Sequence, residues 1–280
     1  MQMLNRLEQA RELDGVAEKV QAVVTGTIRS QRLRDLLHGT WLGHPLHPVL
    51  VQLPVGAFVS AAVLDLLPGM RNAATKLIGL GVATAPPAIL AGWTDWSQMT
   101  KDRQRVGLVH ASANGVAVAL YAASLVARKR GRSGVGLAFA GLSVAGLGAY
   151  LGGHLSYARS AGVNQAAPEI ARVPEEWTEI CSLASLPDEK PVVRSVGAVP
   201  VLLYRTASLV TAMIERCGHE TGPLGNGEVV GSGADACVVC PWHGSTFRLT
   251  DGAVVHGPAA SDQPLLGVRV KAGMVEVRRP

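Results

Sequence analysis

The stretch from Cys217 to His243 decides how the C-terminal part of this chain folds. It reads Cys217-Gly218-His219, then twenty residues, then Cys240-Pro241-Trp242-His243. Each pair offers one thiolate and one imidazole from a tight turn, and both are ligands for iron and zinc. The spacing therefore predicts a metal centre that is clasped between two separate loops.

The ligand order Cys, His, Cys, His resembles that of the Rieske iron-sulfur family, over a region from about Trp177 to the C-terminus. In that family two histidines replace two cysteines on one iron of a 2Fe-2S cluster. The resemblance implies that Cys217 and Cys240 hold one iron of the cluster. It implies equally that His219 and His243 hold the other.

A zinc site of mixed Cys and His ligands is the alternative, because it uses the same residue types at similar spacing. Cys-x-His is an unusual half of a zinc site, and the flanking Gly222-Pro223-Leu224 and Gly244-Ser245-Thr246-Phe247 fit Rieske loops better. The segment from Gly257 to Pro264 has the composition of the proline-bearing loop that covers Rieske clusters. Gly218 and Gly244 are expected to bring backbone N–H groups to the sulfides.

Two positions after the second pair bear on the reduction potential. In the cytochrome bc type of Rieske protein, a Ser and a Tyr donate hydrogen bonds to the cluster, and such bonds raise its potential. Ser245 matches the Ser, whereas Phe247 stands in place of the Tyr and has no hydroxyl. We therefore expect a potential below the bc range, nearer that of ferredoxins.

Of the other two cysteines, Cys181 and Cys237, we expect Cys237 to be a buried free thiol in a Val-rich, strand-like run. The bc-type proteins also carry a disulfide between the two ligand loops. Here Gly222 and Trp242 occupy the matching positions, so this disulfide cannot form.

The composition points to a membrane. Hydrophobic residues make up 48% of the chain and charged residues only 17%, which is unusual for a soluble protein of 280 residues. Residues 1–158 carry 15 Lys or Arg against 8 Asp or Glu, and residues 159–280 carry 11 against 13. The basic excess thus lies in the hydrophobic half, which favours lipid headgroups over nucleic acid as a partner.

Four apolar segments, each near the ~20 residues that cross a bilayer, predict a transmembrane helical bundle. A soluble helical bundle is the alternative, but the third and fourth segments contain no charged residue. The segments are Pro48–Leu67, Leu77–Trp93, Val106–Ala127 and Gly134–Tyr157.

Short Val-rich runs between Gly, Pro and Asp turns follow, and they predict a small antiparallel all-β domain. The expected fold is therefore multi-domain, a four-helix transmembrane bundle and then a β Rieske domain. The expected boundaries are a surface helix region at 1–37, the transmembrane domain at 38–158, a linker at 159–176 and the Rieske domain at 177–280.

The hydrophobic half also resembles a known family on three motifs: His38 to Pro48, Gly92 to Trp96, and Gly152-Gly153-His154. This is an uncharacterised family of bacterial four-span membrane domains, domain-of-unknown-function family 2231, and it implies an architecture without a mechanism.

Antiparallel threading of four spans places several histidines at one membrane face. Intramembrane histidines are commonly functional, although residues near helix ends can also bond water, headgroups or frayed carbonyls. We treat them as a possible second site for a haem, a metal or a quinone; they are His44, His47, His110 and His154. Asp65, near the far end of the first segment, is expected to be a proton-relay residue or a snorkelling acid.

An even number of spans returns the chain to the side where it began. No export signal is visible, so we expect both the N-terminus and the Rieske domain in the cytoplasm. The positive-inside count does not decide, because seven basic residues lie on one side and six on the other.

The cluster passes one electron at a time, which predicts a membrane-bound, ferredoxin-like component of an oxidoreductase system. Its partners would be a soluble reductase or oxygenase, or the membrane quinone pool. A redox or oxygen sensor, in which the cluster state controls the bundle, is the alternative. Only 37 residues follow His243, which is too few for the mononuclear iron domain of a Rieske oxygenase. A stand-alone enzyme is therefore not expected.

Overall fold

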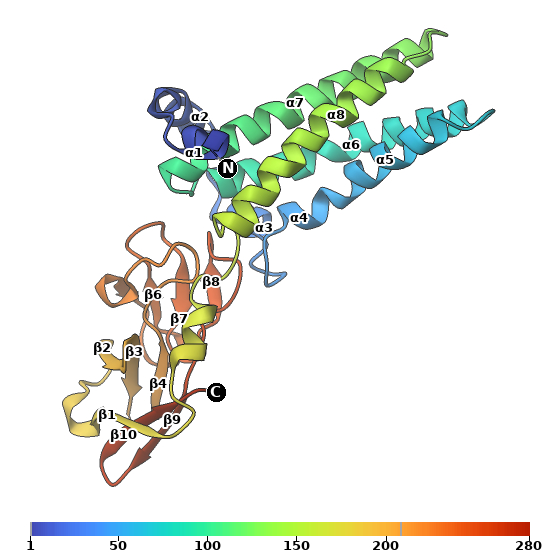
Figure 1. The fold of residues 1–280 in the computed structure, drawn as a ribbon. Coiled ribbons are helices and arrows are strands. Elements are labelled where there is room, and N and C mark those ends of the chain that lie inside the picture. The colour runs from blue at the N-terminus through green and yellow to red at the C-terminus, as the bar shows by residue number, and fades with distance from the viewer. Residues whose placement is uncertain (1, 208) are drawn as a thin grey trace. The chain divides into compact units, whose positions relative to one another are not determined.

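The computed structural model describes residues 2–207 and 209–280, and these form two compact units. One unit comprises residues 1–30 and 45–161 and is helical. The other comprises residues 31–44 and 162–280 and contains all the strands (Figure 1). The division differs from the predicted boundaries at 37/38 and 158/159, because residues 31–44 group with the strands.

The helical unit is built on four apolar helices, each long enough to cross a membrane. The first of these four helices consists of a short helix, α4, and a longer one, α5, with a break between them at Val51. The fourth helix ends in one π-helical turn. Their bounds are α4 (His47–Leu50), α5 (Gln52–Asp65), α6 (Arg71–Trp96), α7 (Lys101–Lys129), α8 (Val135–Gly153) and the π-helical His154–Ala158.

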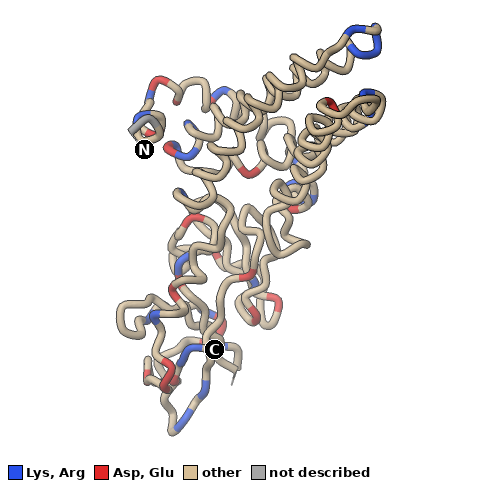
Figure 2. The backbone as a smooth tube through the Cα atoms, turned by 45° about the vertical axis from the view of Figure 1, so that its right-hand side comes forward, with Lys and Arg blue, Asp and Glu red and all other residues tan. Residues whose placement is uncertain are grey.

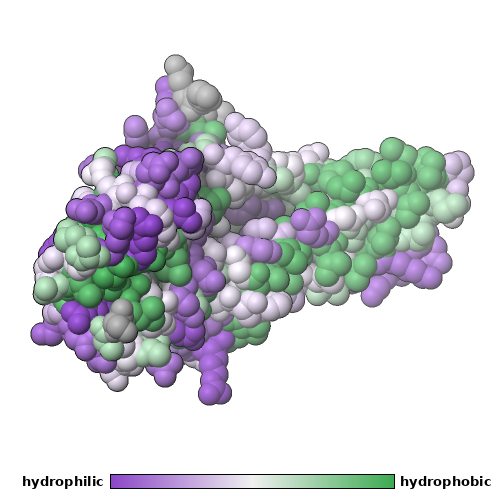
Figure 3. All heavy atoms as spheres, turned by 90° about the horizontal axis from the view of Figure 1, so that it is seen from below, coloured by the Kyte–Doolittle hydropathy of each residue, from purple (hydrophilic) through white to green (hydrophobic). Residues whose placement is uncertain are grey.

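These helices have the surface expected in lipid. Charged residues gather at their ends and leave the middle of each helix nearly free of charge (Figure 2). Large apolar side chains on the outside are exposed, and Leu53, Val59 and Val116 are about half accessible (Figure 3). Water would penalise such a surface, whereas hydrocarbon would not.

Two aromatic rings and two glycines hold the bundle core together. Phe58 of α5 stacks on Tyr121 of α7, with ring centroids 3.7 Å apart. A Cβ on Gly81 would lie 2.4 Å from the Phe58 ring, and one on Gly141 would lie 3.1 Å from Tyr121. Helices α6 and α8 can approach the stacked rings only because these positions are glycine.

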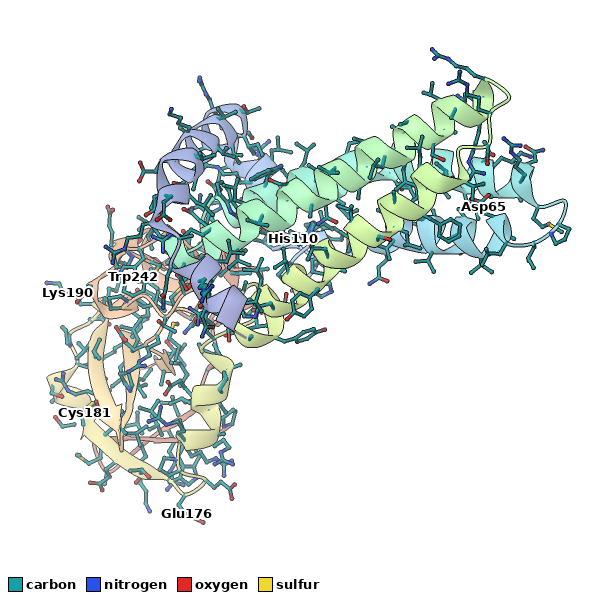
Figure 4. The ribbon with its side chains drawn as sticks, turned by 45° about the horizontal axis from the view of Figure 1, so that its top comes forward. Asp65, His110, Glu176, Cys181, Lys190 and Trp242 are labelled. Carbon is teal, nitrogen blue, oxygen red and sulfur yellow. The ribbon has the colours of Figure 1, made fainter. Side chains whose placement is uncertain are left out.

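An ion pair lies at the end of the bundle where α5 and α7 end. Arg128 binds both carboxylate oxygens of Asp65, with one bond of 2.8 Å, and both side chains are 1% exposed. Figure 4 shows Asp65 at that end of the helices. Asp65 is thus not a snorkelling acid, because its carboxylate is buried against Arg128 of α7. A proton-relay role for Asp65 stays a prediction.

Short helices precede the bundle, within the region expected to be a surface helix region at residues 1–37. They are α1 (Gln2–Glu8), a 3-10 turn (Arg11–Leu13), α2 (Asp14–Thr27) and α3 (Gln31–His38). Arg105 of α7 forms a two-bond ion pair with Asp14, at 2.7 and 2.8 Å. This pairing lowers the pKa of Asp14 below its ordinary value. The first two helices therefore belong to the helical unit.

The second unit consists of three antiparallel sheets. The first has the order β1-β10-β9, the second β2-β3-β4 and the third β5-β6-β7-β8. Its strands are β1 (Thr178–Ser182), β2 (Val192–Val196), β3 (Val199–Thr206), β4 (Leu209–Ile214), β5 (Glu228–Val230), β6 (Cys237–Val239), β7 (Thr246–Arg248), β8 (Val254–His256), β9 (Gly267–Lys271) and β10 (Met274–Arg278).

The strands bury two apolar clusters. The larger one lies around Val199, Leu203 and Ile214. The other lies around Phe247 and Leu249 and includes Cys217 and Cys240, the cysteines of the two Cys-His pairs. The fold class, a helical bundle followed by a small antiparallel β domain, is as predicted.

The segment predicted to be a linker is part of this β unit. Residues 167–172 form a 3-10 helix, and Ala166 and Val173 on either side are fully buried in the larger core cluster. The polar and small composition of residues 159–176 predicted a linker between the two domains. Ala166 and Val173, which lie within this predicted linker, are instead buried in the core of the β unit.

Candidate metal centre

Two loops carry the four predicted ligands. The first loop follows β4 and contains Cys217 and His219, and the second joins β6 to β7 and contains Cys240 and His243. The structure brings the two pairs together. The thiols of Cys217 and Cys240 lie close enough to shift each other's pKa, and the centroids of the two imidazole rings lie 5.1 Å apart with ring planes at 87°.

The backbones of the two loops have the same design. In the first, the N–H of Cys217 donates to the carbonyl of Gly222, and the N–H of Thr221 donates to the carbonyl of Cys217. In the second, the N–H of Cys240 donates to the carbonyl of Ser245, and the N–H of Gly244 donates to the carbonyl of Cys240. The residue four after each cysteine is left-handed, with φ of 60° at Thr221 and 79° at Gly244. Each cysteine thus opens a turn that closes on itself.

The cysteines and histidines differ in burial. Cys217 and Cys240 are 1% and 3% exposed and belong to the core cluster around Phe247, whereas both histidines are partly exposed. Trp242, between the second cysteine and histidine, is 55% exposed. Figure 4 labels it on the surface of this unit. The histidine side of the centre therefore faces the surface.

The electrostatics suit metal binding. The hydrogen bond between the thiols lowers the pKa of Cys240 to about 6 and, together with burial, raises that of Cys217. Burial also lowers the pKa of His243, so its imidazole is neutral near pH 7. A neutral imidazole and a thiolate are the states in which these groups bind metals. His243 and Cys240 therefore favour the binding state, whereas the Cys217 thiol must lose its proton when a metal binds.

The ring separation tests whether two imidazoles fit one iron. With about 2.1 Å from metal to nitrogen, each ring centroid lies ~3.2 Å from the metal, so tetrahedral ligation separates the centroids by about 5.2 Å. The separation of His219 and His243 is 5.1 Å. No three His, Cys, Asp or Glu side chains within residues 2–207 and 209–280 group around a single ion. The donor set thus fits a cluster in which two irons take two protein ligands each.

A third loop, residues 257–264, fastens both ligand loops. The N–H of Ala259 donates to the hydroxyl of Ser245 at 3.0 Å. Gln263, which is 2% exposed, accepts from the N–H of Gly218 and donates to the carbonyls of Ile214 and Arg216. Sequence reasoning found this loop by its composition but missed Gln263, because a glutamine amide carries no local signal of its long-range partners.

One expectation about this site is wrong. Gly218 and Gly244 do not offer N–H groups to the sulfides, because Gly218 donates to the Gln263 side chain and Gly244 to the carbonyl of Cys240. Ser245 retains its own O–H for donation, since its oxygen is the acceptor for Ala259.

Two segments distant in sequence brace the loops from outside. Asn164 donates to Ser261 and to the carbonyl of Asp262, and the Gln165 amide donates to the carbonyl of His219 at 2.9 Å. From the other segment, Asp35 of α3 accepts from the N–H of Gly257 at 3.0 Å and pairs with His256 at 2.9 Å.

His38 of α3 is 2% exposed, and a Cβ on Gly257 would lie 2.9 Å from its ring. His256 and His38 thus belong to the support of the third loop. Neither is simply a surface or membrane-interface residue.

Cys237 is a buried free thiol, as predicted. All four cysteines are unpaired with one another by disulfides, and the Cys237 thiol donates to the carbonyl of Asp235. A Cβ on Gly222 would lie 2.7 Å from the sulfur of Cys240 and 3.1 Å from the Trp242 ring. The first loop therefore reaches the second through a position that accepts no side chain.

The histidines of the helical unit are arranged differently from the prediction of one common site. His47 and His110 lie near each other, with ring centroids 6.3 Å apart. His154 instead bonds the carboxylate of Glu8 at 2.7 Å, and His44 belongs to the other unit.

The fold and site define a small iron-sulfur domain of the Rieske class joined to a helical domain. In agreement, residues 176–271 match the family model of the Rieske [2Fe-2S] domain. Residues 43–165 match the model described as predicted membrane protein (DUF2231). The chain thus combines a Rieske domain, which carries a Rieske-type 2Fe-2S cluster, with a domain of that membrane family.

Two ferredoxins are similar to the Rieske part. The anthranilate 1,2-dioxygenase ferredoxin subunit of Burkholderia cepacia is 28% identical over 102 residues, which are 36% of this chain and 91% of the relative. Ferredoxin CarAc of Metapseudomonas resinovorans is also 28% identical over 102 residues and is covered to 92%. Among solved structures, the ferredoxin of carbazole 1,9a-dioxygenase from Nocardioides aromaticivorans IC177 shows 21% identity and a TM-score of 0.34, covering 37% of this chain and 98% of that one.

Proposed function

We propose that the chain is a membrane-bound electron-transfer protein, in which Cys217 and Cys240 hold the inner iron of the cluster and His219 and His243 the outer iron. The single observation that carries this proposal is the asymmetry of the site: both cysteines are buried, whereas both histidines are partly exposed. The cluster supplies a centre that takes up and releases one electron.

The residues of the chain set the conditions for that exchange. The cysteine pair lies in the apolar cluster around Phe247, which keeps water from the inner iron. The partly exposed histidines and Trp242 form the surface that a redox partner can contact. The similarity to ferredoxin subunits of dioxygenases supports a partner of the reductase or oxygenase type, and it favours electron transfer over redox sensing.

We place this exchange at a lipid bilayer that the four helices cross. Residues 31–44 precede the first span and residues 162–280 follow the fourth, yet they form one compact unit. Four crossings are an even number, so both pieces emerge on the same side, as a shared unit requires. We propose the cytoplasm as that side and the membrane quinone pool as an alternative electron partner.

The test is a redox experiment on the full chain in detergent. The reduced protein should give the EPR signal of a His-ligated 2Fe-2S cluster, and mixing with oxidised cytochrome c should abolish it, with one electron transferred per cluster. A Cys240→Ser variant is the control and should transfer none. A cluster that cannot be reoxidised, or a zinc-loaded colourless protein, would refute the proposal.

Membrane location is tested separately. The full chain should remain in the membrane pellet after an alkaline carbonate wash, and a protease added to intact cells should leave the Rieske domain uncut. Release by carbonate would exclude the spanning arrangement, and cleavage from outside would exclude the cytoplasmic side.

A further inference from the structure

His47 and His110 form a pair within the helical unit that the cluster does not use. His47 begins α4 and His110 lies on α7, and their ring planes stand at 80° with centroids 6.3 Å apart. Both rings are partly buried, and Figure 4 shows His110 within the bundle. The nitrogen atoms of two imidazoles between apolar helices need hydrogen-bond or metal partners, because water is scarce there.

Backbone carbonyls fix the tautomer of both rings. The Nδ1 of His47 lies 2.8 Å from the carbonyl oxygen of Ala88, and the Nδ1 of His110 lies 2.8 Å from that of Gly148. A carbonyl oxygen only accepts, so each Nδ1 carries the hydrogen, and a neutral ring then has its lone pair on Nε2. Histidines that bind metals show this pattern, because the bond from the second nitrogen orients the ring.

Neighbouring helices hold the two rings in place. A Cβ on Gly92 of α6 would lie 2.9 Å from the His47 ring, and a Cβ on Gly152 of α8 would lie 3.0 Å from the His110 ring. The amide of Asn114 lies 3.4 Å from both ring nitrogens of His110 and donates to its carbonyl at 2.9 Å. The rings therefore rest on glycine backbone, and their orientation is set by packing as well as by the carbonyl bonds.

The separation of the rings distinguishes two kinds of metal site. Two imidazoles on a tetrahedral ion have centroids about 5.2 Å apart, whereas two on opposite sides of one metal have centroids about 6.4 Å apart. The pair at the cluster, at 5.1 Å, matches the first value, and His47 and His110, at 6.3 Å, match the second. Opposite ligation by two imidazoles is the axial arrangement of a six-coordinate haem iron.

We propose that His47 and His110 are the axial ligands of a non-covalently bound haem, with both Nε2 atoms on the iron. Of the two other histidines predicted for this site, His154 bonds the Glu8 carboxylate through Nε2 at 2.7 Å, which is much closer than the 3.4 Å between the His110 Nε2 and the Asn114 amide. His44 lies outside the helical unit. The proposal concerns binding of haem and stands apart from the electron transfer proposed for the cluster.

The test uses the full chain purified in detergent from haem-replete cells and measures haem as the pyridine haemochrome. The wild type should hold one haem per chain. His47→Ala and His110→Ala should each reduce haem content at least tenfold. His154→Gln, which keeps an N–H donor for Glu8, is the matched control and should retain the wild-type content.

A second variant separates ligation from folding. His110→Met should retain haem, because a thioether also binds haem iron, and His/Met ligation should raise the haem potential above that of the wild type. A purely structural role of His110 predicts no change in potential.

Three results would overturn the proposal. They are a wild-type protein that takes up no haem even when hemin is added, a wild type that holds a metal ion without haem, and full haem retention in both alanine variants.

Discussion

The two histidine pairs of this molecule are held by different means. His219 and His243 lie on loops whose turns close on the cysteines, and both residues are partly exposed. His47 and His110 lie on helices, and each bonds the backbone of another helix. The contrast shows that loops can present imidazoles to an outside partner, whereas helices position them inward. Variants can therefore disturb one pair and leave the other intact.

The largest expected effect is on the cluster itself. Cys240→Ser removes a buried thiolate ligand, so the EPR signal of the cluster should disappear. Helicity and thermal unfolding of the bundle should stay at wild-type values, because the sulfur belongs to the β unit. A variant that keeps a full 2Fe-2S signal would contradict the assignment of this ligand.

The next effect is on the bundle. Asp65→Asn leaves Arg128 charged and buried without its anion, which costs about 3–5 kcal/mol. The loss should appear as a lower midpoint for detergent-induced unfolding. The double variant Asp65→Asn with Arg128→Met removes the charge and should recover part of the loss. Unchanged cluster EPR in both variants would show that the cluster site of the β unit does not depend on the Asp65–Arg128 ion pair of the bundle.

A smaller effect is expected at Gln263. Gln263→Leu leaves the N–H of Gly218 and two carbonyls without their partner, at about 1–3 kcal/mol for each group that stays dry. The first loop should loosen, and the cluster should be lost faster to a chelator. Gln263→Glu keeps an oxygen for Gly218 and should lose the cluster at an intermediate rate. Equal rates in all three proteins would exclude a positioning role.

The smallest effect is a change in potential. Ser245→Ala removes the O–H that can donate to the cluster, and a hydrogen bond of about 1 kcal/mol corresponds to a decrease on the order of 40 mV for one electron. A redox titration followed by EPR measures this shift. Thr246→Ala is the neighbouring control, because its hydroxyl bonds the carbonyl of Gly244, and its potential should match the wild type.

Local patterns in the sequence were enough for much of this structure. The four spans, the strands and the two Cys-His pairs follow from apolar periodicity and from ligand spacing, both of which act over a few residues. The supports did not follow, since Gln263, Asn164 and the Arg128 partner of Asp65 act through contacts tens of residues away. The composition of the predicted linker also did not show that its residues Ala166 and Val173 are buried in the core of the β unit.

The placement of residues 31–44 in the β unit has a consequence for biosynthesis. Asp35 and His38 leave the ribosome before the 117 residues of 45–161, and their partners Gly257 and His256 leave it after those residues. The iron-binding domain can close only after all the hydrophobic helices have been made. Synthesis of these helices therefore precedes loading of iron and sulfide, and a fragment beginning at residue 162 would mature without its N-terminal brace.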